Sequence, residues 1–147
     1  MIVKDEEEVL KNCLDSIKKI VDEIIIVDTG STDNTKNIAY KYTHKVYDFI
    51  WENDFSKARN YAISKATKDY ILWLDADDYL NKESINRFKT LKSNINDEID
   101  IYYFLYEFNQ NYEPFYRERL FKNNGKLKFV GKVHEVIIPS GNNNMKI

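Results

Sequence analysis

The sequence lacks most of the features that mark secreted and membrane proteins. It contains a single cysteine, Cys13, so no intramolecular disulfide can form, which fits a reducing compartment. No segment approaches the ~18 consecutive apolar residues of a transmembrane helix. The amino-terminal segment MIVKDEEEVL becomes acidic after too few apolar residues for a signal peptide. These absences predict a cytoplasmic location, either free or peripheral to the inner membrane.

The sequence also lacks an excess of either charge. Its net charge is −2 and its basic residues are spread along the chain, which argues against a nucleic-acid partner. Apolar residues make up 43% of the 147 residues, which is enough to build a hydrophobic core. No linker separates the two halves, so we expect a single domain spanning residues 1–147.

What the first half does contain is a regular alternation of short apolar runs and amphipathic segments. The apolar runs predict strands and the amphipathic segments predict helices. In chain order, beginning with a strand, these elements are expected at residues 2–4, 7–20, 23–27, 34–42, 45–49, 55–66, 70–74 and 81–93. Such an alternation predicts an α/β fold with a mainly parallel sheet and helices on both faces.

The second half has a different pattern. It begins with an aromatic, strand-like segment, and two further apolar runs, 116–121 and 126–130, flank a predicted hairpin turn at Asn123-Asn124-Gly125. This part should therefore be more antiparallel. Most of its aromatic side chains are explained by packing on the sheet, and Trp51 and Trp73 are likewise expected in the core.

Acidic clusters follow three of the expected strands. Residues 5–7 follow the first strand, Asp28 ends the second, and residues 75–78 follow the fourth. In an open parallel sheet, ligands bind at this carboxyl edge. Crowded carboxylates repel one another unless a cation lies among them, and Mg²⁺ commonly combines one or two carboxylates with substrate phosphates. The alternative is that these acids cap turns and helix ends, but three clusters on one edge favour a metal–phosphate site.

Four segments carry a resemblance to a known family. MIVKDEEEVL, IIIVDTGSTDNT, FSKARNYAISKA and YILWLDADDYL resemble, in order and spacing, the signatures of family 2 glycosyltransferases. The later segments YRERLFKN and FVGKVHEVI resemble a bacterial subgroup whose catalytic domain is often followed by helical repeats. The resemblance implies the GT-A fold, with a Rossmann-like, mainly parallel sheet and a more antiparallel carboxyl-terminal part.

The resemblance also implies a metal site for Mg²⁺ or Mn²⁺. Asp75 and Asp77 match its Asp-x-Asp signature. Asp77 would bind the metal directly, and Asp75 would reach the ribose, the metal or a metal-bound water. His134 lies in a segment that resembles the subgroup's Val-His-Glu and is a candidate third ligand. The alternative for His134 is a purely structural role.

A nucleoside site is implied beside the metal. Asp28 resembles an acid that supports the nucleoside, and Thr29 stands where many relatives carry a second acid, so it would bond the base or ribose as a neutral group. Arg59 and Asn60 match an Ala-Arg-Asn segment near the nucleotide. The alternative for Arg59 is a salt bridge to a local acid such as Asp54. The predicted nucleotide contacts, besides the metal-site residues, are Val3, Asp5, Asp28, Thr29, Arg59 and Arg119.

The remaining candidates lie in the second half. Arg117 and Arg119 alternate along a strand and so share one face, where they would meet the diphosphate; the alternative is an exposed face with solvated charges. Glu135 follows His134 and is the candidate general base. The base must take the acceptor proton opposite the departing diphosphate, on a segment other than the one that carries Asp75.

The resemblance implies an inverting, metal-dependent glycosyltransferase of the hexosyltransferase type. Its donor would be a nucleotide-diphosphate sugar, with a UDP-sugar expected, and its acceptor a glycan, a lipid carrier or a protein. The first expected strand is short and the last apolar segment, 136–138, ends near the carboxyl terminus, so the domain is expected to be truncated at both ends. Truncation keeps a second possibility open, a non-catalytic sugar-nucleotide-binding or interaction module.

Overall fold

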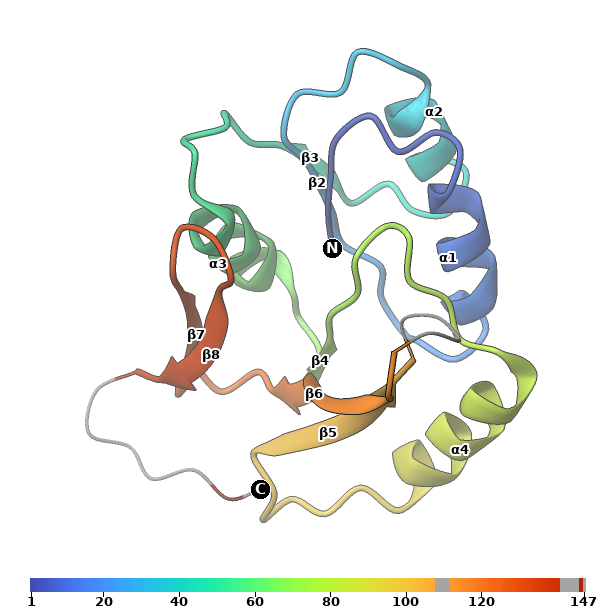
Figure 1. Cartoon of the computed structure of the whole chain (residues 1–147), viewed down its shortest axis with the longest axis vertical. Helices are drawn as coiled ribbons and strands as arrows, with labels where there is room; N and C mark the ends of the chain where they lie inside the picture. The colour runs from blue at the N-terminus through green and yellow to red at the C-terminus, as the bar shows by residue number, and fades with distance from the viewer. Residues whose placement is uncertain (108–111, 141–145, 147) are drawn as a thin grey trace.

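The parallel sheet occupies the amino-terminal part of the chain in the computed structural model, which describes residues 1–107, 112–140 and 146 (Figure 1). Three short strands, β1 (Ile2–Val3), β2 (Ile26–Asp28) and β3 (Val46–Asp48), pair in parallel in that order. Helices α1 (Leu10–Ile17) and α2 (Thr35–Ala39) connect them. The parallel part of the expected α/β fold is confirmed.

Antiparallel strands make up the rest, which confirms the expected change of pattern. The order β4-β6-β5 joins β4 (Tyr70–Leu72), β6 (Phe115–Lys122) and β5 (Ile101–Tyr106). A separate hairpin joins β7 (Leu127–Val130) and β8 (Val136–Pro139). The sequence predicted that β4 would extend the parallel sheet. That prediction is wrong, because β4 pairs antiparallel with β6. No ladder joins β4 to β1 within the described part of the chain.

The expected hairpin turn at Asn123-Asn124-Gly125 is wrong, because the strands on either side of it, β6 and β7, do not pair with each other. The side-chain amide of Asn123 donates to the carbonyls of Ala66 and Lys68, at 3.1 and 3.0 Å. Its backbone N–H donates to the carbonyl of Asp69 at 2.8 Å. These bonds anchor the turn to the segment between α3 (Phe55–Lys65) and β4, so the chain leaves the sheet there.

The helices carry the features that their sequences predict. Helix α1 buries its apolar face, which consists of Leu10, Cys13, Leu14 and Ile17. Helix α4 (Lys82–Ser93) begins after Asn81, whose side chain accepts the N–H of Ser84 at 2.9 Å, as expected for a capping residue. Among the described residues, no helix has both the length and the apolar character needed to cross a membrane.

Two groups of buried apolar side chains form the core. One packs α1 against the parallel sheet and includes Leu14 and Ile26. The other includes Trp73, whose ring meets that of Phe129 edge-on at 5.2 Å. The expectation of a core position is confirmed for Trp73 and wrong for Trp51. Trp51 is half-buried and belongs to neither group, because it lies in the loop that follows β3.

Helix α3 is fixed to the β7–β8 hairpin, which lies beside it (Figure 1). The side-chain amide of Asn60 donates to the carbonyl of Phe129 and accepts its N–H, both at 2.9 Å. The helix begins after Asp54, whose carboxylate accepts the N–H of Lys57 at 3.1 Å. The position of α3 is therefore set by a cap at its start and by a two-point contact with β7.

A cavity of about 760 Å³ lies between the amino-terminal side of the parallel sheet and β4. Met1, Ile24 and Ile25 line it from one side, and Ile71 and Leu72 line it from the other. The amino group of Met1 donates a hydrogen bond to the carbonyl of Ile25 at 2.8 Å. Charged residues such as Glu23, Arg59 and Lys122 also line this space, which separates the parallel from the antiparallel sheet.

Candidate functional site

The carboxyl ends of β1 and β2 form one side of the candidate site. Val3 and Asp28 are neighbours in the ladder, and the chain then turns at Gly30, whose φ is 110°. The Oδ1 atom of Asp28 accepts the N–H groups of Gly30 and Ser31, both at 2.9 Å. Its Oδ2 atom is buried without a hydrogen-bond partner among the residues that the structure describes. Asp28 is 2% exposed and does not line the cavity at this edge, so its carboxylate mainly holds the turn that follows β2.

Thr29 and Asp5 lie differently at this edge. Thr29 lines the cavity described next, and its hydroxyl donates to the carbonyl of Val3 at 3.2 Å. Asp5 braces two turns: its carboxylate accepts the N–H of Thr32 at 2.7 Å, and its own N–H donates to the hydroxyl of Ser31. Asp5 does not line the cavity, so its side chain holds the loops that border the site.

A cavity of about 470 Å³ lies at the carboxyl edge. Its lining consists of Ile2, Val3, Lys4, Glu6, Thr29, Trp51, Phe55, Arg59, Asp75, Ala76 and Asp77. Most of the predicted nucleotide and metal contacts are thus brought together from the ends of β1, β2 and β4 and from α3. Sequence reasoning missed the aromatic pair Trp51 and Phe55. The sequence did offer a signal for this pair, because both residues lie just before the Ala-Arg-Asn segment that was predicted to be near the nucleotide.

The turn after β4 holds its acids in different ways. Asp78 is buried: its carboxylate accepts the N–H of Asp75 at 2.8 Å and the hydroxyl of Tyr106 at 2.9 Å, and it pairs with Arg119 at 2.9 Å. Burial and the bond to Asp78 raise the pKa of Tyr106 to about 12, so the phenol remains a donor. Asp77 is exposed, and no hydrogen bond or ion pair with another described residue holds its carboxylate. Asp78 is therefore structural, whereas Asp77 is available to a cation.

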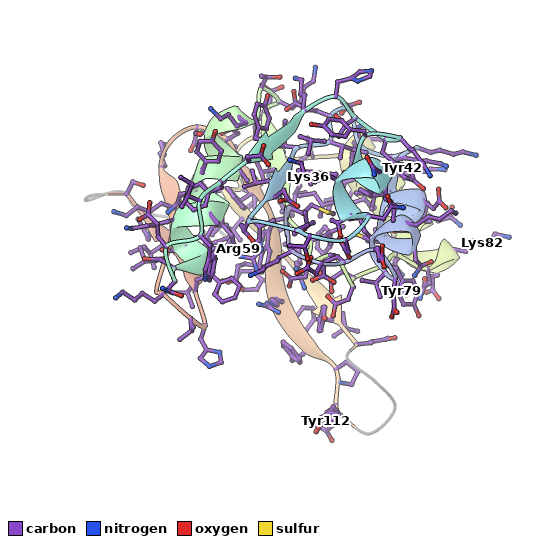
Figure 2. The ribbon with its side chains drawn as sticks, turned by 90° about the horizontal axis from the view of Figure 1, so that it is seen from above. Lys36, Tyr42, Arg59, Tyr79, Lys82 and Tyr112 are labelled. Carbon is purple, nitrogen blue, oxygen red and sulfur yellow. The ribbon has the colours of Figure 1, made fainter. Side chains whose placement is uncertain are left out.

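Arg59 joins two of the predicted carboxylates. Its Nη2 lies 2.7 Å from Oδ1 of Asp75, its Nε lies 2.5 Å from Oε1 of Glu135, and its guanidinium stacks over the ring of Trp73. Figure 2 shows Arg59 on α3, facing the interior. Burial alone would raise the pKa of Asp75, but the charge and hydrogen bond of Arg59, together with the charges of Arg119 and Arg117, outweigh burial and lower that pKa. The alternative pairing with Asp54 is wrong, since Asp54 caps α3.

Arg117 and Arg119 share one face of β6, as their alternation predicts. Their guanidinium groups lie over the ring of Trp73, at 5.0 and 4.2 Å from its centroid. Arg119 is only 2% exposed and pairs with Asp78 at 2.9 Å and with Asp75 at 3.8 Å. The alternative of an exposed, solvated face is therefore wrong for Arg119. Arg119 holds the acidic turn after β4 through its ion pair with Asp78, and its side chain does not line the cavity.

His134 and Glu135 lie in the loop between β7 and β8. His134 is exposed, with a φ of 53°, and the described residues contain no group of three His, Cys, Asp or Glu side chains that could hold a metal. The structure thus does not bring His134 to Asp75 and Asp77. The side chain of Glu135 is 8% exposed. Glu135 and Asp75 share the guanidinium of Arg59, so the two carboxylates lie on one cation and do not face each other across the cavity.

One side of the cavity is acidic. Burial raises the pKa of Glu6, and the negative charges of Asp77, Asp33 and Asp75 raise it further. Glu6 and Asp77 both line the cavity. Carboxylates that disfavour each other's charge are relieved by a bound cation. Together with the free carboxylate of Asp77, this arrangement fits a divalent ion that a substrate phosphate would help to hold.

Comparison with known sequences gives matches along nearly the whole chain. The sequence profile of glycosyl transferase family 2 matches residues 1–144. A TPR repeat-containing protein of Synechococcus elongatus is 42% identical over 140 residues, which are 93% of this chain and 34% of that protein. The prophage-derived glycosyltransferase SunS of Bacillus subtilis is 37% identical over 142 residues, which are 92% of this chain and 33% of SunS. The chain therefore spans about a third of the length of these relatives.

Solved structures share the fold. TarS 1–349 of S. aureus in complex with UDP has a TM-score of 0.51 and 28% identity, over 63% of this chain and 30% of that one. Glucosyl-3-phosphoglycerate synthase of M. tuberculosis has a TM-score of 0.56 and 20% identity, over 69% and 42% of the two chains. The same synthase in complex with Mn²⁺ and UDP-glucose has a TM-score of 0.53 and 18% identity, over 68% and 39%.

Proposed function

Because the chain belongs to glycosyl transferase family 2, we propose that it binds a nucleotide-diphosphate sugar, of the UDP class, and takes part in transfer of the sugar with inversion. The observation that carries this proposal is the cavity at the carboxyl edge. There Thr29, Arg59 and the free carboxylate of Asp77 line one space. A nucleotide needs such a combination of neutral, cationic and metal-binding groups.

Asp77 and Asp75 would hold Mg²⁺ or Mn²⁺ in this proposal, and His134 would join them only after its loop moves. When bound, the ion supplies Lewis-acid stabilisation of the leaving diphosphate. Asp77 needs no rearrangement, since no described partner competes for it. Asp75 must share its carboxylate with Arg59, which pairs with it at 2.7 Å.

Arg59 would meet the diphosphate. Its guanidinium lines the cavity and already binds two carboxylates. Phosphate oxygens suit the same planar set of donors, so a bound diphosphate competes with Asp75 and Glu135 for it. Arg119 would act indirectly by fixing the acidic turn, since it is buried and pairs with Asp78 in that turn. Competition for Arg59 also provides a way to free Glu135 for the acceptor proton.

The similar structures support the choice of nucleotide and metal. TarS was crystallised with UDP, and glucosyl-3-phosphoglycerate synthase with Mn²⁺ and UDP-glucose. On this basis we propose a UDP-sugar donor, a hexose as the transferred group and Mn²⁺ or Mg²⁺ as the cofactor. The acceptor belongs to one of three classes: a glycan, a lipid carrier or a protein. We also propose a cytoplasmic location, free or peripheral to the inner membrane.

UDP should stabilise the purified chain in the presence of Mn²⁺, and more than GDP does. A ligand present at 100 times its dissociation constant adds about 2.7 kcal/mol to the free energy of unfolding. Thermal unfolding with each nucleotide, in Mn²⁺ and in EDTA, measures this effect. No stabilisation by any nucleotide would contradict the donor site. Stabilisation without release of UDP from UDP-sugars would instead favour the non-catalytic binding module.

We further propose that the chain is the donor-binding domain of a longer polypeptide, in which an extended apolar segment precedes Met1. The N–H groups of Thr29 and Val27 donate to the carbonyls of Val3 and Met1, both at 3.0 Å. The next donor in that series, the N–H of Ile25, has no acceptor among the described residues. A strand continuing backward from Met1 would supply one and would enter the cavity beside β4, where the side chains of Ile71 and Leu72 offer apolar contacts.

An apolar strand of five or six residues added before Met1 should stabilise the chain and flatten the dependence of its stability on pH. Burial and the charge of Arg59 lower the pKa of the Met1 amino group from 8.0 to about 6. The unfolded chain therefore binds more protons between pH 6 and pH 8, so stability is full above pH 8 and falls as the pH drops to 6, by about 2–3 kcal/mol.

Urea unfolding at pH 6 and pH 8 measures both effects. A glycine–serine extension of equal length is the matched control, because it also turns the amino group into an amide but has no apolar side chains to pack against Ile71 and Leu72 in the cavity. It should flatten the pH dependence without adding stability at pH 8. Equal stability of the two extended proteins at pH 8 would contradict the strand proposal.

A further inference from the structure

The aromatic pair Trp51 and Phe55 forms a wall of the cavity at the carboxyl edge. The wall belongs to the loop between β3 and α3, and this loop is tied to the end of β2 because the N–H of Phe49 donates to the carbonyl of Asp28 at 2.8 Å. Phe55 is 38% exposed and Trp51 is half-buried. Two large aromatic rings are thus kept at a ligand-sized space instead of in the core.

The loop holds the two rings in a defined position. The indole N–H of Trp51 donates to the side-chain carbonyl of Asn53 at 3.2 Å, and the two rings meet edge-on with centroids 4.8 Å apart. Asn53 has a φ of 55°, a left-handed conformation that non-glycine residues seldom adopt. The N–H of Phe55 donates to the carbonyl of Lys132 at 3.0 Å. Since the indole N–H is already bonded, the ring offers a ligand mainly its apolar π surface.

The order of groups along the cavity indicates which part of a nucleotide the wall would meet. Asp75 and Asp77 follow β4, Thr29 follows β2, and Trp51 follows β3. Within the parallel sheet β3 is the strand beyond β2, on the side away from β1. A diphosphate held with a metal at Asp77 therefore has its nucleoside directed past Thr29 and toward Trp51. The donor sugar, on the opposite side of the diphosphate, is directed away from that wall.

We propose that Trp51, supported edge-on by Phe55, stacks on the base of the donor nucleotide. This inference rests on the proposed donor site and adds a binding residue to it. Stacking suits every base, because each has a π face. It would fix the plane of the base, while the hydroxyl of Thr29, which lines the cavity and donates to Val3, can still accept a hydrogen bond from the polar edge of the base or from the ribose. Trp51 would thus set the position of the nucleoside, and the polar groups would determine which base is bound.

The test compares UDP with inorganic pyrophosphate, which keeps the metal-bound diphosphate but has no base. Calorimetry in Mn²⁺ on the full chain should show that Trp51→Ala weakens UDP binding by about tenfold or more, with pyrophosphate affinity changed less than about twofold. Trp51→Phe should retain most of the UDP affinity. Tyr79→Ala is the matched control, because Tyr79 is 63% exposed and does not line the cavity (Figure 2).

Each other outcome overturns the proposal in an identifiable way. Unchanged UDP affinity in Trp51→Ala removes Trp51 from the site, and an equal loss for pyrophosphate assigns it to loop structure. A loss for UDP-glucose but not for UDP places the ring against the donor sugar. If the unmodified chain binds neither UDP nor pyrophosphate, the donor site itself fails. UDP should also quench tryptophan fluorescence in the unmodified chain but not in Trp51→Phe, which retains the buried Trp73.

Discussion

Asp77→Ala should reduce the affinity for UDP in Mn²⁺ to the value measured in EDTA. Asp77 is exposed and lines the cavity, and no other described residue neutralises its carboxylate. Its neighbours differ: Asp75 pairs with Arg59, and Asp78 is buried and pairs with Arg119. Asp77 is therefore the acid most available to a metal, and its loss should also lower turnover by more than about a hundredfold, because metal stabilisation of the leaving group is worth several kcal/mol.

Calorimetric titration of UDP in Mn²⁺ and in EDTA tests this expectation. The substitution should hardly change the free energy of unfolding, since no described contact is lost. Glu83→Ala is a suitable control, because Glu83 is an exposed acid on the surface of α4 whose one ion pair among the described residues is with Arg87. Equal UDP affinity with and without Mn²⁺ in the unmodified chain would contradict a metal-dependent site.

Glu135→Gln should lower the turnover number by at least about a hundredfold if Glu135 is the general base. The amide keeps the shape of the side chain, and its oxygen can still accept the Nε–H of Arg59, so the loop should stay in place. It cannot accept the acceptor proton. Nucleotide affinity should therefore change little. Steady-state kinetics with a UDP-sugar, combined with UDP calorimetry, separates the two effects.

Glu113→Gln is the matched control, since Glu113 is an exposed acid near the start of β6. Near-normal turnover of Glu135→Gln would eliminate Glu135 as the base. Loss of UDP binding would recast it as the residue that positions Arg59. The structure gives that second role a clear basis, because a single guanidinium holds both Glu135 and Asp75. The turnover and binding measurements together decide between the two roles.

Local patterns predicted those parts of the fold that depend on local chemistry. The apolar face of α1 and the cap at Asn81 follow from residues a few positions apart, and both are confirmed. The partner of β4 and the path of the chain after Asn123 depend on contacts with residues far along the sequence. Asn123, for example, is bonded to Ala66, which lies 57 positions earlier. No short pattern encodes such a pairing.

The candidate site divides in the same way. Thr29, Asp75 and Asp77 could be assigned to the cavity because each follows a strand whose carboxyl end is predictable. The electrostatic partners of these residues could not be predicted from the sequence. Arg59 and Glu135 are 76 positions apart, and their ion pair exists only because the β7–β8 hairpin lies against α3. A second ion pair of Arg59, with the carboxylate of Asp75 after β4, makes Asp75 a shared ligand where the sequence predicted an open one.

Asn60 covers part of the edge of β7. Its amide binds both backbone groups of Phe129, on the side of β7 that does not face β8. An uncovered strand edge is a template for pairing with another chain and so for aggregation. One side chain closes the middle of this edge as a short neighbouring strand would. The third residue of the Ala-Arg-Asn segment thus occupies backbone groups of β7 that could otherwise pair with another chain, a role that a screen for activity alone would overlook.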